Sequence, residues 1–269
     1  LNSSTACFWM KQVAHKKTAA SQQHHTDPAR ATYAFSGTAV GKLPIPALVD
    51  ARLSKMSARL LELGEARTAW TSGQQFCEQL DRLVSVADIE SGLQQGWRQY
   101  EEATAKSVYW QEEIDWLVYA LVGLCDPPTD ASGAEHSTPP GSRPFEHESG
   151  YNAGVSDRAR REERAPAAQS RPAHWNQRID LLSAEGIRLM ETREFKRQWR
   201  DTEQNIDQQQ FRRQAEREWL ERWLVAKVEA VVRSNASVMS TRSIISLLLA
   251  ESYAANFSAV AQYLGADLA

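Results

Sequence analysis

The segment 126–173 most constrains what this chain can fold into. Its sequence, DPPTDASGAEHSTPPGSRPFEHESGYNAGVSDRARREERAPAAQSRPA, is rich in Pro, Gly, Ser and charged residues and poor in aliphatic ones. Such a composition buries too little apolar surface to offset the conformational entropy lost on ordering. The sequence therefore predicts a disordered linker over 126–173, which separates two independently folded parts of the 269-residue chain.

Both parts show the apolar periodicity of amphipathic helices. A helix is predicted from Ala47 to about residue 63, and others at about 74–85 and 88–104. The clearest pattern is YWQEEIDWLVYALVGL at 109–124, where Gly123 marks the end of the helix. Its apolar stripe consists of Trp110, Ile114, Leu117, Val118 and Leu121. Beyond the linker, helical patterns occupy 174–199, 211–234, about 241–250 and about 254–264. The helix at 211–234 has an apolar stripe made of Phe211, Ala215, Trp219, Leu220, Trp223 and Leu224.

The first residues predict a helix start. Asn2, Ser3, Ser4 and Thr5 can each accept a hydrogen bond from a free helix N–H group, and an apolar run with Phe8 and Trp9 follows. After a polar loop at 15–31, the stretch ATYAFSGTAVGKLPIP at 31–46 predicts a short strand. Its glycines and prolines, Gly37, Gly41, Pro44 and Pro46, should break any continuing element.

The predicted fold class is thus mainly α, with a short β-containing hinge near the N-terminus and two helical modules joined by the linker. The predicted domains are a region with the β hinge at 1–46, a helical module at 47–125, the linker at 126–173 and a C-terminal helical module at 174–269.

The charge of −3 conceals an uneven distribution along the chain. Residues 1–60 contain eight Lys and Arg and two Asp, a net charge of +6, whereas 61–130 contain four basic and thirteen acidic residues, a net charge of −9. The first region can face a polyanion, and the second is unsuited to phosphates. We expect the acidic region to face protein or solvent.

The sequence predicts no membrane segment, because the longest apolar run, IISLLLA at 244–250, is far shorter than the roughly 18 residues needed to cross a bilayer. The cysteines Cys7, Cys77 and Cys125 are odd in number and form no CxxC pair. This favours a reducing compartment, and we expect a cytoplasmic protein.

No catalytic, cofactor-binding or metal-binding residue is predicted. The tetrapeptide DPPT at 126–129 resembles the DPPY motif of amino-methyltransferases, but Thr129 has no ring to stack on a flipped base. The stretch GTAVGK at 37–42 is one residue short of a phosphate-binding loop, and Leu43 replaces the required Ser or Thr. The loop histidines His15, His24 and His25 have no Cys or carboxylate at metal-ligand spacing apart from Asp27, so solvated histidines are expected.

The basic stretch 11–42 is the candidate site. Lys and Arg neutralise phosphates, and Gln suits bidentate pairing with adenine in the major groove of duplex DNA. A solvated surface loop is an equally good interpretation of these residues. The predicted phosphate contacts are Lys11, Lys16, Lys17, Arg30 and Lys42, and the predicted base readers are Gln22, Gln23 and His24.

Several stretches, taken together, resemble the large adenine-specific DNA methyltransferases of BREX and phage-growth-limitation defence systems, which are relatives of type IIG restriction–modification enzymes. These stretches are, in order, LNSSTACFWMKQV, YAFSGTAVGKLPIP, EEIDWLVYALVGL, RIDLL with IRLMETREFKRQW, and EREWLERWLVAKVE. The predicted linker looks long for the family.

The resemblance implies that the chain is the C-terminal part of a longer enzyme, downstream of its methyltransferase domain, with residues 1–46 at the end of a target-recognition region. The S-adenosylmethionine loop and the NPPY-type motif are then expected upstream of Leu1. The expected partners are double-stranded DNA, the upstream domain and other defence proteins. The alternative is a non-catalytic helical module that docks partner proteins and does not contact DNA.

Overall fold

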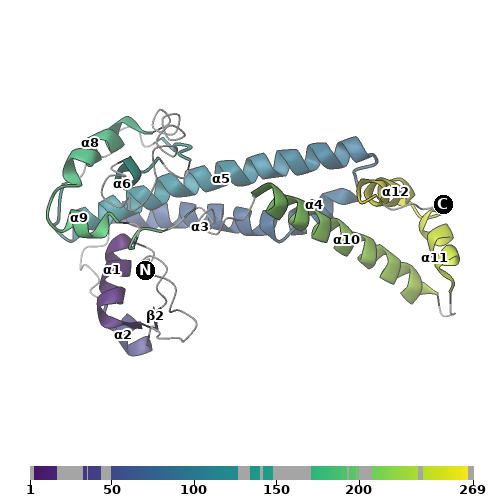
Figure 1. The fold of residues 1–269 in the computed structure, drawn as a ribbon, viewed down its shortest axis with the longest axis horizontal. Helices are drawn as coiled ribbons and strands as arrows, with labels where there is room; N and C mark the ends of the chain where they lie inside the picture. The colour runs from purple at the N-terminus through teal and green to yellow at the C-terminus, as the bar shows by residue number, and fades with distance from the viewer. Residues whose placement is uncertain are drawn as a thin grey trace. The chain divides into compact units, whose positions relative to one another are not determined.

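The fold is mainly α, as predicted (Figure 1). The computed structural model describes residues 3–16, 33–34, 36–43, 50–126, 134–139, 142–147, 171–192, 194–197, 199, 208–235 and 239–265. None of the helices in this described part combines the length and the apolar character that a bilayer crossing requires.

The chain divides into two compact units. Unit 1 comprises residues 1–63 and 104–200, and unit 2 comprises residues 64–103 and 201–269. Two helices, α3 (Ala51–Thr71) and α5 (Val86–Leu121), each run from one unit into the other. The division therefore differs from the predicted modules at 47–125 and 174–269, because long helices carry the chain across the expected boundary.

Each unit contains further helices, and unit 1 also contains two strands. Unit 1 holds α1 (Ser4–Val13), β1 (His15–Lys16), β2 (Tyr33–Ala34), α2 (Gly37–Gly41), α6 (Pro144–His147), α8 (Ala173–Leu181) and α9 (Ile187–Met190). Unit 2 holds α4 (Gln74–Leu80), α10 (Gln208–Ser234), α11 (Thr241–Leu248) and α12 (Ala254–Tyr263).

The predicted start of the first helix is confirmed. Ser3 is the N-cap of α1, and its hydroxyl accepts the Ala6 N–H at 3.2 Å. This bond satisfies one of the backbone donors that every helix leaves free at its start. Asn2, which was predicted to share this role, lies outside the described residues.

The helices predicted separately at 88–104 and 109–124 are one helix of 36 residues, α5. The prediction of a break was wrong, since no Gly or Pro lies between Thr104 and Tyr109 to cause one. The predicted end at Gly123 is confirmed. Gly123 has φ +78°, its N–H bonds the Ala120 carbonyl, and the Leu124 N–H reaches back to Tyr119. This is a Schellman motif, which requires the left-handed conformation that glycine adopts without strain.

The β-containing hinge predicted at 31–46 is not shown as such. The structure has two strands of two residues each, with His15 opposite Ala34 and Lys16 opposite Tyr33. The glycines expected to break the chain, Gly37 and Gly41, instead bound the short helix α2, in which the Val40 N–H bonds the Ser36 carbonyl. Phe35 and the prolines Pro44 and Pro46 lie outside the described residues.

The structure also differs from the predicted disorder of 126–173 in the stretches 134–139 and 142–147. Thr138, Ser142 and Arg143 are buried there. The Arg143 guanidinium lies over the Phe145 ring at 4.5 Å and donates to the Glu146 carboxylate and the Arg197 carbonyl. Interactions of polar groups therefore order a stretch whose apolar content is low. Residues 127–133, 140–141 and 148–170 of the predicted linker lie outside the described residues.

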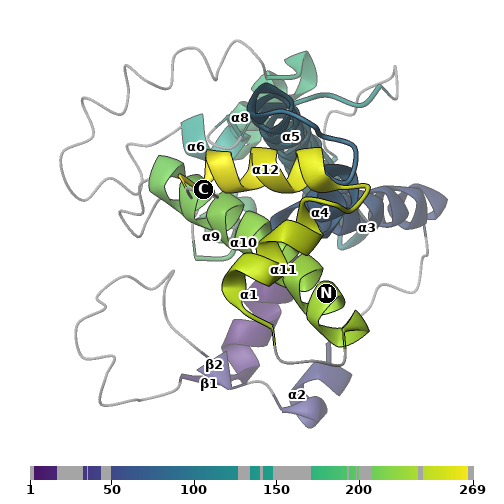
Figure 2. The same cartoon turned by 90° about the vertical axis from the view of Figure 1, so that its right-hand side faces the viewer.

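The core of unit 2 is built on aromatic side chains. Trp70, Trp97 and Trp219 come from α3, α5 and α10, and their ring centroids lie 5.4–5.7 Å apart. Helix α10 also packs against α4, α11 and α12 (Figure 2). A Cβ atom at Gly96 would lie 1.8 Å from Trp70, so only glycine lets α5 approach this ring. The predicted stripe of α10 is confirmed at Trp219, Leu220 and Trp223, which are buried, but its Phe211 is exposed.

The core of unit 1 joins the end of α5 to α8 and α9. Trp116 and Tyr119 of α5 pack with Leu182, Ile187 and Met190. A second cluster stacks Tyr109 on Trp175 of α8, with the rings 5.9 Å apart. Helix α1 packs against α9 and contributes Phe8 to this core.

Candidate functional site

The structure describes three of the eight residues predicted to contact DNA. Lys11 lies in the last turn of α1, and Lys42 follows α2 in an exposed turn. Lys16 belongs to β1, where the structure describes the backbone. The remaining predicted residues, Lys17, Gln22, Gln23, His24 and Arg30, lie outside the described residues.

Lys11 is bound within its own unit. Its ammonium donates to the Glu194 carbonyl and lies 5.2 Å from the centre of the Tyr33 ring and 5.3 Å from that of Phe195. Such cation–π contacts, together with a hydrogen bond, favour the position that the ammonium already occupies. Lys11 thus fastens α1 to the chain after α9, and a phosphate would have to compete with these contacts.

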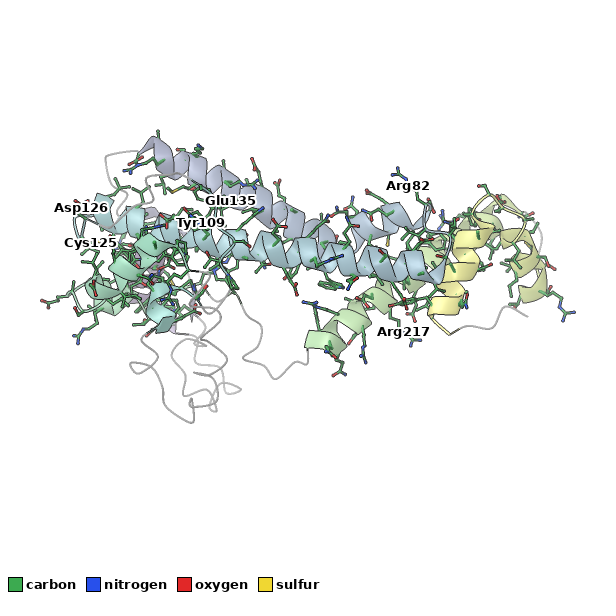
Figure 3. All side chains as sticks on the ribbon, turned by 90° about the horizontal axis from the view of Figure 1, so that it is seen from above. Arg82, Tyr109, Cys125, Asp126, Glu135 and Arg217 are labelled. Atoms are coloured by element: carbon green, nitrogen blue, oxygen red, sulfur yellow. The ribbon has the colours of Figure 1, made fainter. Side chains whose placement is uncertain are left out.

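Two other basic residues of the first 60 are also paired. Arg59 of α3 forms a bidentate ion pair with Glu135, at 2.9 and 3.0 Å, and contacts Glu62. Trp110 donates to the same Glu135 at 2.6 Å, and Figure 3 shows Glu135 beside α5 near Tyr109. The hydrogen bonds from Arg59 lower the pKa of Glu135 to about 2. Arg52 is paired in the same way with Asp50.

The carboxylates of α5 were predicted to face protein or solvent, and three of them lie inside unit 1 together with other polar residues of this helix. Gln111, Glu112, Glu113 and Asp115 are all at most 5% exposed. The sequence analysis identified the apolar stripe of this helix but not its buried charges. A signal was present, since Trp116 and Tyr119 stand four and seven residues after Glu112 and so mark a second covered face.

Glu113 is at the centre of a fully satisfied arrangement. Its two oxygens accept both ends of the Arg178 guanidinium at 2.8 Å, and Oε1 also contacts His174 and the Trp175 indole N–H. Burial disfavours the charged form, but the hydrogen bond from His174 and the charge of Arg178 hold the pKa of Glu113 below its usual value. Glu113 is therefore ionised, and it holds α8 against α5.

Glu112 and Asp115 belong to a different arrangement around Lys196. The Lys196 ammonium lies 2.9 Å from Glu112, 3.1 Å from Asp115 and 2.5 Å from Glu191. Tyr119 donates to Glu191 at 2.7 Å. Burial disfavours a charged lysine, but the three carboxylates raise the pKa of Lys196 above its usual value. The cluster joins α5 to the segment that follows α9.

The described residues contain no candidate metal site, and their cysteines are not activated as nucleophiles. Within them, no three His, Cys, Asp or Glu side chains are arranged to hold a metal ion. Burial raises the pKa of Cys7, Cys77 and Cys125, which disfavours the reactive thiolate.

A cleft of about 360 Å³ in unit 2 is lined by polar groups that already bind one another. Glu216 accepts the Trp97 indole N–H at 2.6 Å, and Arg212 pairs with Glu101. The Arg212 guanidinium also lies over the Trp97 ring at 4.9 Å, so that this aromatic face is covered. Stacking of a nucleobase or an adenosine group on Trp97 would require Arg212 to move.

Among curated proteins, the chain is similar to the adenine-specific methyltransferase PglX of Streptomyces coelicolor. The two are 26% identical over 225 residues, and the match covers 74% of this chain and 17% of PglX. The chain thus corresponds to a minor part of that relative's length. No protein-family model matches the chain, and no solved structure matches it.

Proposed function

We propose that this chain is the DNA-recognition and scaffold part of a site-specific adenine DNA methyltransferase in a phage-defence system of the restriction–modification type. The observation that carries the proposal is the similarity to a protein named as an adenine-specific methyltransferase, over 74% of this chain. S-adenosylmethionine would then be bound, and the adenine methylated, by another part of the enzyme.

The buried charges support the scaffold role. Glu113 with Arg178, and Glu112 and Asp115 with Lys196, connect α5 to elements more than 60 residues away in sequence. Removal of one partner from a buried pair leaves an uncompensated charge, so these contacts specify one arrangement of the helices. A rigid support of this kind suits a part that holds a DNA-binding segment in place.

The basic stretch 11–42 supports the DNA-recognition role. The structure distinguishes two of its lysines by the contacts that they make. Lys42 is exposed, whereas Lys11 is held by Glu194, Tyr33 and Phe195. We therefore assign phosphate contacts first to Lys16, Lys17, Arg30 and Lys42. Gln22, Gln23 and His24 would read base edges.

The second candidate function is a helical module that docks partner proteins of the same defence complex without contacting DNA. The pairing of Arg52, Arg59 and Lys11 within the chain favours it, because three of the eight basic residues of 1–60 already have acceptors. The acidic composition of 61–130 favours it as well.

A salt titration of duplex DNA binding distinguishes the two. Each phosphate-neutralising charge contributes about 0.9 to the slope of the logarithm of the binding constant against the logarithm of the salt concentration. Lys16→Ala/Lys17→Ala should therefore flatten the slope by about 2 units. The control, Arg217→Ala/Arg233→Ala, removes the same charge from exposed positions of α10 and should leave the slope unchanged. An identical slope in the wild type and the Lys16/Lys17 variant would favour the protein-docking function.

A further inference from the structure

Among the described residues of unit 1, three buried carboxylates surround the single ammonium of Lys196. They belong to Glu112, Asp115 and Glu191, and none of the four side chains is more than 1% exposed. The cations of Arg143 and Arg171 also act on Glu112, and Arg143 acts on Asp115 as well, but the described neighbours still leave one more carboxylate than cation. Glu113 is paired with Arg178, and Arg143 is paired with Glu146.

The hydrogen bonds of the cluster are also incomplete. Asp115 is well supplied, since it accepts from Ser4, Gln111 and Lys196. Glu112 accepts from Trp116 and Lys196, and Glu191 from Tyr119 and Lys196, but each bonds through Oε1. The Oε2 atoms of Glu112 and Glu191 are both buried and have no hydrogen-bond partner among the described residues.

An uncompensated negative charge in a buried site is strongly unfavourable, and proteins relieve such a site by taking up a proton. We propose that this cluster is a proton-binding site, in which the folded chain holds one proton on Glu191 and keeps Glu112, Asp115 and Lys196 charged. The site is a property of unit 1 and exists whether or not the chain binds DNA.

The position of Glu191 explains why it is the group that takes the proton. Glu112 and Asp115 on α5 and Lys196 on the segment after α9 face Glu191, together with Tyr119 and Cys125. The cations of Arg143, which precedes α6, and Arg171, which precedes α8, act on Glu112. Burial and the neighbouring Glu112 raise the pKa of Glu191 to about 7, although Lys196 opposes this. Asp115 has the larger set of hydrogen-bond donors.

The proton matters for the attachment of α1. Asp115 holds the first residue of α1, Ser4, and shares Lys196 with Glu191. While Glu191 is neutral, the positive charge of the Lys196 ammonium stabilises only the carboxylates of Asp115 and Glu112. Ionisation of Glu191 adds a third negative charge to the same ammonium, which weakens the support of α1.

Infrared spectroscopy of the whole 269-residue chain tests the proposal directly. Exposed carboxyl groups are ionised at pH 6, so a carbonyl band of a protonated carboxylic acid should remain there in the wild type and disappear by about pH 9. The band should be absent from Glu191→Gln, which mimics the neutral form. Absence of the band from the wild type at pH 6 would overturn the proposal, and this measurement needs no variant.

Unfolding equilibria give a second readout. Because the folded state binds the proton more tightly, stability falls as the pH rises from about 4.5 to about 7. Relative to Glu191→Gln, the unfolding constant of the wild type should rise by nearly tenfold per pH unit in this window. The control is Glu113→Gln, which removes a buried carboxylate of α5 that is paired with Arg178. It should lower the stability of the fold without changing the dependence of the unfolding constant on pH in this window.

The same experiment excludes a bound cation. If K⁺ or Mg²⁺ abolished the difference between the wild type and Glu191→Gln above pH 7, the cluster would be a cation site and the proposal would be wrong. If the unfolding constants of the wild type and Glu191→Gln changed with pH in the same way, that result would also contradict the proposal.

Discussion

Asp115 binds Ser4 through both of its oxygens: Oδ1 accepts the Ser4 backbone N–H at 2.8 Å, and Oδ2 accepts the Ser4 hydroxyl at 2.7 Å. The two residues are 111 positions apart in the sequence, and both are buried. A carboxylate at the first turn of a helix binds its free N–H groups and complements the helix dipole. Asp115 therefore links the start of α1 directly to α5.

Ser4→Ala should destabilise the protein by about 1–3 kcal/mol, because it removes a hydrogen bond to a buried carboxylate. Urea unfolding measures the effect. Ser57→Ala, at an exposed position of α3, is the control and should change stability by less than about 0.5 kcal/mol. Equal stabilities of the two variants would show that the Ser4 hydroxyl contributes nothing.

Arg178→Met should destabilise the protein by about 3–5 kcal/mol, because it leaves the Glu113 carboxylate buried without its cation. The matched control is Arg217→Met, which breaks an exposed ion pair with Glu221 one turn away on α10, where Figure 3 marks Arg217. Exposed pairs contribute about 0–1 kcal/mol. Thermal unfolding of both variants checks the difference, and a loss of similar size in each would contradict a structural role for Glu113 and Arg178.

Two glycines of unit 2 should respond in opposite directions to alanine. Gly96→Ala places a methyl group 1.8 Å from the Trp70 ring and should cost about 1–3 kcal/mol or prevent folding of this unit. Gly64→Ala, in the interior of α3, meets no atom within 4 Å and should stabilise the helix by about 0.5–1 kcal/mol. Measured stabilities that do not fall on opposite sides of the wild type would contradict the described packing of α5 on Trp70.

The ion pair between Glu135 and Arg59 should make the stability of the protein depend on pH in the acid range. Because the pKa of Glu135 is lowered from 4.5 to about 2, its contribution to stability is complete above about pH 4.5 and is lost as the pH falls towards 2. The stability difference between the wild type and Glu135→Gln should shrink over this window. Removal of the partner by Arg59→Gln should reduce the pH dependence of the difference, because only Trp110 and Lys106 then still lower this pKa, and an unreduced dependence would refute the assigned pairing.

The chain by itself should neither bind S-adenosylmethionine nor methylate DNA, because its sequence contains no glycine-rich cofactor loop and no aromatic residue in the DPPT stretch. Isothermal titration calorimetry checks the first point, and transfer of a labelled methyl group to duplex DNA checks the second. Stoichiometric cofactor binding would contradict the proposed division of labour within the enzyme.

The sequence alone determined the features that depend on neighbouring residues. The helical class, a capped helix start within residues 2–5, the end of α5 at Gly123 and the buried stripe with Trp219 and Trp223 all follow from local rules of capping and periodicity, whereas the structure selected Ser3 among the four cap candidates. For the predicted DNA-binding residues, the sequence shows only their charges and their positions along the chain. The proposed contacts still depend on this distribution of charge in the sequence.

Only the tertiary structure decided which charges lie inside. The sequence placed Glu112, Glu113 and Asp115 in a helix but could not show that Arg178, Glu191 and Lys196 would meet them, because these partners are 65 to 84 residues away along the chain. The same holds for Arg143, which is buried within a stretch of low apolar content. Periodicity reports only which residues share a face of one helix, whereas burial of a charge depends on the cations and donors that other segments bring to it.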